Sequence, residues 1–327
     1  MEKNSNLLEV HDLSISFSVY GKITKVIDNI SFSVGKGQRV GLVGESGCGK
    51  TTTLRAILNV LPSNAIVKSG EILFNGSDVF KMPEKELQQF RRTGAGMIFQ
   101  DPSSALNPVF TIGDQLTTAL KYASNEKMDK AAIYNQVKGA LRDVYLADPE
   151  RIMNSYPFQL SGGMKQRVCI AVTLAAGRNL LLADEPGTSL DVTIQDQILR
   201  LINKLVLDKH LSVIMVSHSL GVIREVTSFV NIMYAGTIVE SGDTNMVFQQ
   251  PKHPYTISLM NCVPKLTGEG IAEGVPGRIP DYANPPLGCR FSPRCPYAKE
   301  ICHKEKPPKI EVGPNHLVSC YFANEVK

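Results

Sequence analysis

A glycine-rich stretch, GESGCGKTT at residues 44–52, combines residue types that bind phosphate groups. Glycine lets backbone N–H groups turn inward around a phosphate, where a side chain would obstruct them. The Lys50 ammonium supplies a point charge, and the Thr51 hydroxyl suits Mg²⁺ as a ligand. The stretch follows an apolar run, RVGLVG at residues 39–44, and precedes an expected helix that begins near Thr51. This context predicts a phosphate-binding loop between a buried strand and a helix.

A second group of chemically active residues ends an apolar run, LLLADE at residues 180–185. Asp184 would hold Mg²⁺, directly or through water, and Glu185 would activate an attacking water as a general base. For this run alone, a strand that merely ends in two solvated acids is the commoner case. The phosphate-binding loop in the same chain favours the catalytic interpretation.

Alternating strands and helices must position these two stretches. Buried strands are predicted by short apolar runs at residues 39–44, 180–184, 212–217 and 230–234. The helical stretches between them imply a mostly parallel sheet with helices on both faces. Alternating polarity over residues 7–17 and 26–34 predicts antiparallel strands near the N-terminus, and residues 112–158 predict a helical insert.

A change in composition near residue 250 indicates a domain boundary, because 12 of the 19 prolines lie in the last 77 residues. We expect a nucleotide-binding domain over residues 1–250, with a helical subdomain at about 101–176. Residues 251–327 would form a proline-rich, cysteine-containing extension.

Charge and hydropathy exclude several classes of protein. The chain is 43% hydrophobic and 20% charged, which is typical of a soluble globular protein. Its net charge of +4 is modest, whereas a nucleic-acid binder is expected to carry a concentrated basic patch, so we expect no nucleic-acid partner. No signal peptide is visible, and the apolar runs are shorter than the roughly 20 residues that span a bilayer. We therefore expect a chain that does not cross the membrane itself.

The stretch QLSGGMKQR at residues 159–167 is the most specific motif of the chain. With it, the chain resembles the ATP-binding cassette (ABC) family, the ATPase subunits of membrane transporters. Other residues match this family's motifs in order: Gln100 in MIFQDP (Q-loop), Ser189 to Asp191 (D-loop), His218 in VSHS (switch histidine) and Phe17 (the aromatic that stacks on adenine). The resemblance implies an α/β fold of the P-loop NTPase, ABC type.

The resemblance also implies the roles of individual residues. Glu185 and His218 would be catalytic, and Thr51, Gln100 and Asp184 would hold Mg²⁺. ATP would be contacted by Phe17, Gly44, Glu45, Ser46, Gly47, Cys48, Gly49, Lys50, Thr51, Thr52 and Gln100. In the family, the residues corresponding to Ser161, Gly162 and Gly163 contact the ATP of the opposite subunit, so that two cassettes enclose two nucleotides.

Some positions are ambiguous or depart from the family pattern. Tyr20 is an alternative to Phe17 as the stacking residue, and core packing is an alternative role for Phe17. Gly187 stands where threonine is usual after DEP, and Ser219 where an acidic residue is common. Neither departure removes a chemically active group, but both leave the turnover rate open.

Several further stretches are similar to the dipeptide/oligopeptide (and nickel) importer ATPases. They are FQDPSSALNP (99–108), LDVTIQDQIL (190–199), HPYT (253–256) and CRFSPRCPYAKEIC (289–302). This resemblance implies an ATPase at the cytoplasmic face of the membrane that powers uptake of di- or oligopeptides. Its partners would be a second ATPase subunit, two transmembrane permease subunits and, indirectly, an extracytoplasmic substrate-binding protein. Alternatives are a nickel or metal-chelate importer, a cassette protein that acts on ribosomes or DNA, and a protein that holds ATP without turnover.

The extension contains four cysteines, Cys289, Cys295, Cys302 and Cys320, separated by 5, 6 and 17 residues. Structural zinc sites usually have closer cysteine pairs, whereas iron–sulfur clusters tolerate wider spacing. Because some members of the resembled subfamily bind a [4Fe–4S] cluster here, we expect these four cysteines to hold one. Zinc, with His303 or His316 as a further ligand, and free thiols are the alternatives. Cys48 lies in the phosphate loop, where we expect a point of oxidative inhibition.

Overall fold

The computed structural model describes residues 6–124, 128–217, 219–262 and 274–325. These residues form two compact units, of which unit 1 is Met1–Lys81 with Met215–Lys327 and unit 2 is Met82–Ile214. Strand β8 (Ser212–Val216) contains the point where unit 2 ends and unit 1 resumes. The domain boundary expected near residue 250 stays a prediction.

An antiparallel sheet forms the N-terminal part of unit 1, with strand order β2-β1-β4-β5. Its strands are β1 (Asn6–Val19), β2 (Lys22–Gly35), β4 (Ala65–Phe74) and β5 (Ser77–Asp78). Leu8, Val10 and Ile15 of β1 are fully buried. The antiparallel strands expected at the N-terminus are confirmed, whereas β4 was not predicted from the sequence.

A second set of strands in unit 1 carries the phosphate loop. β3 (Arg39–Val43) runs parallel to β9 (Phe229–Tyr234), which continues antiparallel into β10 (Thr237–Asp243). The extension adds β12 (His316–Val318) beside β10, and then β11 (Ile310–Gly313). The accompanying helices are α1 (Lys50–Ile57), α9 (Leu220–Val226), α10 (Thr244–Gln249), α11 (Pro254–Asn261), η3 (Ser292–Arg294) and α12 (Glu300–Lys304).

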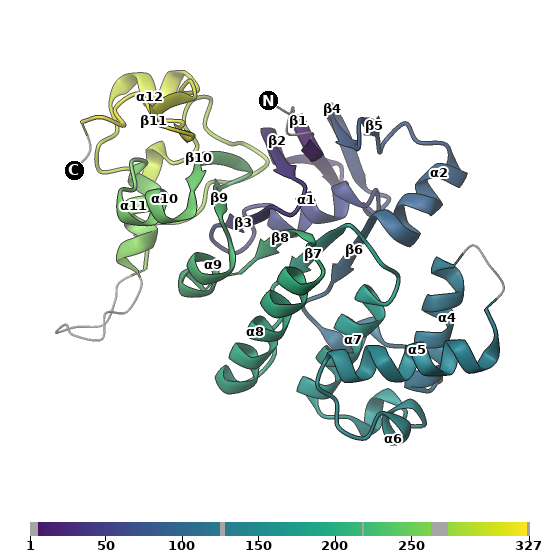
Figure 1. The fold of residues 1–327 in the computed structure, drawn as a ribbon. Helices are drawn as coiled ribbons and strands as arrows, with labels where there is room; N and C mark the ends of the chain where they lie inside the picture. Colours follow the sequence, from purple (N-terminus) through teal and green to yellow (C-terminus); the bar gives the residue numbers. More distant parts are fainter. Residues whose placement is uncertain (1–5, 125–127, 218, 263–273, 326–327) are drawn as a thin grey trace, which may run out of the picture. The chain divides into compact units, whose positions relative to one another are not determined.

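Unit 2 joins a parallel pair of strands, β6 (Ala95–Ile98) and β7 (Leu180–Asp184), to a group of helices (Figure 1). The helices are α2 (Glu84–Gln89), η1 (Phe90–Gly94), α3 (Pro102–Ala105), α4 (Ile112–Ala123), α5 (Lys130–Asp143), α6 (Pro149–Met153), η2 (Pro157–Gln159), α7 (Gly162–Leu174) and α8 (Val192–Asp208). A capping box between Thr111 and Asp114 satisfies the first N–H groups of α4. The stretch of mixed polarity after residue 111 is therefore helical, as its pattern predicts.

None of the helices in the described parts of the chain has the length and hydropathy needed to cross a membrane.

Buried polar and aromatic contacts attach the extension to the rest of unit 1. The Glu240 carboxylate on β10 lies 2.7 Å from Nε2 of His316 on β12, and both side chains are buried. Phe291 packs against Tyr234 and Tyr255, with ring centroids 5.0 and 5.5 Å apart respectively. The extension therefore shares a buried aromatic core with β9, to which its own helix α11 also contributes.

His253 makes the stability of this core dependent on pH. Burial lowers the pKa of His253 to about 4, although the nearby Glu240 carboxylate acts in the opposite direction. Since the unfolded chain takes up this proton near pH 6.5, the contribution is present above that pH and is lost as the pH falls to about 4. The loss is about 3 kcal/mol of unfolding free energy.

Urea unfolding at several pH values, compared with His253→Asn, measures this contribution. Asparagine is a suitable control because it also accepts a hydrogen bond at a helix N-cap, as Nδ1 of His253 does from the Tyr255 N–H. We expect the variant to lose less stability than the wild type between pH 6.5 and 4. Parallel stability curves for the two proteins would contradict the prediction.

Candidate functional site

The phosphate loop connects β3 to α1 and is closely packed against β9. A Cβ atom at Gly44 would lie 2.1 Å from the Met233 carbonyl oxygen, so no side chain fits there. Gly47 has φ +79°, a conformation that only glycine adopts without strain. The loop ends where α1 begins, at Lys50. Its backbone N–H groups and helix N-terminus suit an anion such as a nucleotide phosphate.

The side chains of Lys50 and Cys48 are both buried inside this loop. The Lys50 ammonium donates to the carbonyl oxygens of Gly44 and Glu45, at 2.8 and 3.0 Å. Burial raises the pKa of Cys48, against the opposing effect of Lys50. The thiol is therefore buried and favoured in its neutral form. Oxidative inhibition at Cys48 stays a prediction.

In unit 2, the two stretches around Gln100 and Glu185 meet. The Gln100 side-chain amide donates to the Glu185 carboxylate at 3.2 Å, and the Ser189 hydroxyl donates to the Gln100 carbonyl at 3.2 Å. Glu185 has φ +47°, an uncommon conformation for a residue other than glycine. Asp184, the last residue of β7, is buried. Residues predicted separately from the Q-loop, the acidic strand end and the D-loop are thus in direct contact.

The signature stretch forms the beginning of α7. Ser161 is the N-cap, and its hydroxyl accepts from the Met164 N–H at 3.3 Å. Ser161 and Gly162 are exposed. A Cβ atom at Gly163 would lie 2.7 Å from Cγ2 of Ile194, so α7 approaches α8 closely here. An exposed helix N-terminus with a hydroxyl is compatible with contact to a nucleotide outside this chain.

The other predicted site residues are more dispersed. Phe17 is half-buried on β1, paired with Thr24 and Ala65, while Tyr20 is fully exposed. Among the loop residues, Ser46 is exposed, Gly49 is buried, and Thr51 and Thr52 are partly buried on α1. His218 lies outside the described residues.

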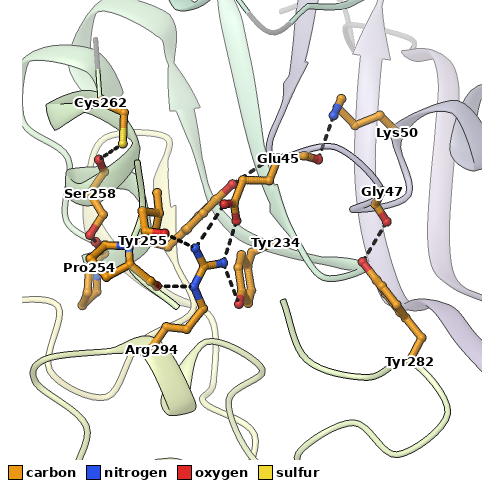
Figure 2. A network of polar contacts seen from close by, with 12 residues as sticks. Glu45, Gly47, Lys50, Tyr234, Pro254, Tyr255, Ser258, Cys262, Tyr282 and Arg294 are labelled. Atoms are coloured by element: carbon orange, nitrogen blue, oxygen red, sulfur yellow. Dashed lines mark hydrogen bonds and ion pairs between the residues drawn. The ribbon is translucent and has the colours of Figure 1, made fainter. Parts of the chain in front are cut away.

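Residues of the extension that contact the phosphate loop were not predicted from the sequence (Figure 2). The Tyr255 hydroxyl accepts from the Glu45 N–H at 2.9 Å, and the Tyr282 hydroxyl donates to the Gly47 carbonyl at 2.8 Å. The Arg294 guanidinium pairs with the Glu45 carboxylate. Burial opposes the charge of Arg294, yet its bonds to Glu45 and Tyr234 raise its pKa. Arg294 lies 249 positions from Glu45, so no local spacing could have indicated this contact.

Comparison with known proteins identifies the family. Residues 27–188 match the family described as "ABC transporter", and residues 239–302 match "Oligopeptide/dipeptide transporter, C-terminal region". The oligopeptide transport ATP-binding protein OppD of Bacillus subtilis (strain 168) is 43% identical over 98% of this chain and 90% of its own length. The chain belongs to the ABC transporter family. The dipeptide transport ATP-binding protein DppD of the same strain is 42% identical, over 99% of this chain and 96% of its own length.

Solved ABC cassettes confirm the expected fold. A dimeric post-hydrolysis structure of the ATP-binding cassette MJ0796 with ADP and phosphate superposes with a TM-score of 0.65 and 25% identity. The alignment covers 72% of this chain and 98% of that cassette. The chain is accordingly an ABC-type ATPase, and the family resemblance drawn from its motifs is confirmed.

The prediction that the four cysteines of the ABC protein's extension hold an iron–sulfur cluster is wrong. Their side chains line one cavity. However, across the described ranges no three or more His, Cys, Asp or Glu side chains are grouped to hold a metal ion, and the matched relatives' names mention no cluster. Burial raises the pKa of Cys289 to about 12, and it also raises that of Cys295 and Cys320. Burial thus favours the neutral form of these three thiols, whereas metal binding needs thiolates. The zinc alternative fails on the same finding.

Two glycines test the steric requirement of the phosphate loop. Gly44→Ala forces a Cβ atom against the Met233 carbonyl, whereas Gly47→Ala meets no atom within 4 Å and carries only the backbone strain of a positive φ. We expect Gly44→Ala to abolish measurable Mg·ATP binding. Gly47→Ala should lower the free energy of unfolding by about 1 kcal/mol.

Fluorescence titration with a labelled ATP analogue and thermal unfolding distinguish these outcomes. A Gly44→Ala protein that binds ATP normally would show that the loop can shift away from Met233.

Proposed function

We propose that this chain is the ATP-hydrolysing subunit of an importer of di- or oligopeptides. The observation that carries the proposal is similarity over almost the whole chain, extension included, to ATP-binding proteins named for oligopeptide and dipeptide transport. No specific observation favours a metal chelate as cargo. Such a subunit works with membrane permease subunits at the cytoplasmic face of the membrane, to which an extracytoplasmic binding protein delivers the peptide.

The phosphate loop binds the triphosphate of ATP. Lys50 contributes positive charge, and the backbone N–H groups of the loop and of α1 donate to phosphate oxygens. Thr51, Asp184 and Gln100 carry oxygen atoms of the kind that Mg²⁺ prefers and would hold the ion, which would neutralise phosphate charge. Phe17 stacks on adenine.

Hydrolysis is assigned to Glu185, with His218 orienting the attacked phosphate. The hydrogen bond from Gln100 holds the Glu185 carboxylate in a defined orientation, and this supports its role as the base that takes a proton from water. Ser161, Gly162 and Gly163 contact the nucleotide of a second cassette, a role supported by the exposure of Ser161 and Gly162. The active form is therefore a dimer of cassettes that ATP holds together.

Replacing the proposed base separates ATP binding from ATP hydrolysis. Glu185→Gln keeps the size and hydrogen-bonding capacity of the side chain but cannot accept the proton. We expect turnover to fall about 10²- to 10⁴-fold while ATP affinity stays unchanged, so that ATP traps a closed dimer. Phosphate release and size-exclusion chromatography with Mg·ATP measure both effects.

Lys50→Ala is the matched control, since it should weaken ATP binding about 10- to 100-fold through loss of a charged donor. Undiminished phosphate release by Glu185→Gln would refute the role of Glu185, and normal ATP affinity in Lys50→Ala would refute the assignment of the loop.

Cargo is tested in vesicles that contain the permease subunits, this ATPase and its partner cassette. We expect the cognate binding protein loaded with a di- or oligopeptide to stimulate ATP hydrolysis and uptake of labelled peptide, with Glu185→Gln as the inactive control. Stimulation by a nickel chelate in place of peptide would overturn the assigned cargo and leave the ATPase activity untouched.

A further inference from the structure

The C-terminal extension contacts the phosphate loop at three points. These are the Glu45 N–H, the Gly47 carbonyl and the Glu45 carboxylate, which bond to Tyr255, Tyr282 and Arg294 respectively. All of these residues belong to unit 1. The loop is therefore held by contacts from the extension as well as by its own backbone (Figure 2).

Arg294 makes the strongest of these contacts. Its Nη1 and Nη2 atoms lie 2.8 and 3.1 Å from the two carboxylate oxygens of Glu45, which is a bidentate pair. The Arg294 side chain is 3% exposed and that of Glu45 is 25% exposed, so solvent screens the pair only in part.

Other groups of the extension fix the guanidinium in this orientation. Nε donates to the Pro276 carbonyl at 2.7 Å, Nη2 to the Val275 carbonyl at 2.6 Å, and Nη1 to the Tyr234 hydroxyl at 3.2 Å. With its donors used and its plane fixed, Arg294 presents a preorganised charge to Glu45.

The position of Glu45 makes this charge important. The Lys50 ammonium lies 3.0 Å from the Glu45 carbonyl oxygen, so the loop's cation and Glu45 share one segment of backbone. An unpaired carboxylate at this residue would add negative charge beside the site for an anionic triphosphate, which weakens binding by like-charge repulsion.

We propose that Arg294 is a positioning residue for the phosphate loop, which neutralises the Glu45 carboxylate and holds it against the extension so that the loop is preorganised for Mg·ATP. The inference rests on the proposed function, because it takes the loop to be the ATP site. The extension is on this account a part of the nucleotide site.

Titration of the purified full-length chain with a fluorescent ATP analogue and Mg²⁺ tests the proposal. We expect Arg294→Ala to weaken binding about tenfold, as truncation of one partner of a hydrogen-bonded charge pair does. Arg294→Lys, which keeps the charge but not the bidentate geometry, should recover most of the loss. Arg294→Ala combined with Glu45→Gln should bind within about threefold of the wild type, because the unpaired charge is removed.

The steady-state kinetics of the assembled transporter separate positioning from general destabilisation. A positioning residue changes KM for ATP about tenfold and leaves kcat at saturating ATP within about twofold. A merely structural role reduces the amount of active protein, which lowers apparent kcat and leaves KM unchanged.

Lys306→Ala is the control for loosening of the extension. The Lys306 ammonium also ties the extension to the cassette, because it pairs with Asp28 at 2.7 Å, and this pair lies outside the phosphate loop. The ATP affinity of the Lys306→Ala variant should equal that of the wild type. Where Arg294→Ala does not fold, Arg294→Gln replaces it, since glutamine can still donate to the backbone carbonyls.

Either of two results would overturn the proposal: an ATP affinity of Arg294→Ala within twofold of the wild type, or no recovery on adding Glu45→Gln. Titration of Lys50→Ala in parallel distinguishes the hypothesis that the loop binds ATP from the hypothesis that Arg294 positions the loop. Normal affinity in Lys50→Ala refutes the ATP site itself, whereas weak binding there with normal binding in Arg294→Ala refutes only the role of Arg294.

Discussion

The close approach of the phosphate loop to β9 is the constraint on which the rest of unit 1 depends. The Met233 carbonyl occupies the space that a Cβ atom at Gly44 would need, so the loop and the end of β9 are packed as one piece. The parallel pairing of β3 with β9, in which Val43 lies opposite Ile232, produces this approach. Because the chain continues from β9 into β10 and then the extension, the same pairing brings the extension's side chains to the loop.

This arrangement changes how the extension should be understood. The four cysteines of this proline-rich segment led to the prediction of a metal cluster. The structure instead shows strand pairing of β12 with β10, a buried pair between Glu240 and His316, and an aromatic core around Phe291. Burial of the Phe291 ring and the surrounding side chains supplies apolar free energy that a short polar segment would otherwise lack. The extension is stable for the same reasons as the rest of the unit.

Local motifs made much of the site predictable, whereas contacts between distant segments did not. The phosphate loop and the acidic end of β7 depend on neighbouring residues, so their spacing alone identified Gly44, Lys50 and Asp184 as candidates. β4 escaped prediction because its exposed positions do not alternate with buried ones over most of its length. The prediction of an iron–sulfur cluster was wrong because the spacing of cysteines in the sequence does not show how their thiols are placed and ionised in the fold. Arg294 could not be found, since its partner Glu45 is distant in the sequence.

The two halves of the proposed chemistry are supported by different parts of the chain. The phosphate loop is shaped by β9 and the extension, both in unit 1, so these elements govern how well ATP is held. Glu185 is oriented by Gln100, which directly precedes the helices of the insert in unit 2. Because that hydrogen bond joins the proposed base to the segment leading into the insert, the orientation of the Glu185 carboxylate depends on the position of Gln100. On the proposed function, the extension acts on ATP binding through the phosphate loop, and Gln100 acts on hydrolysis through the orientation of the base.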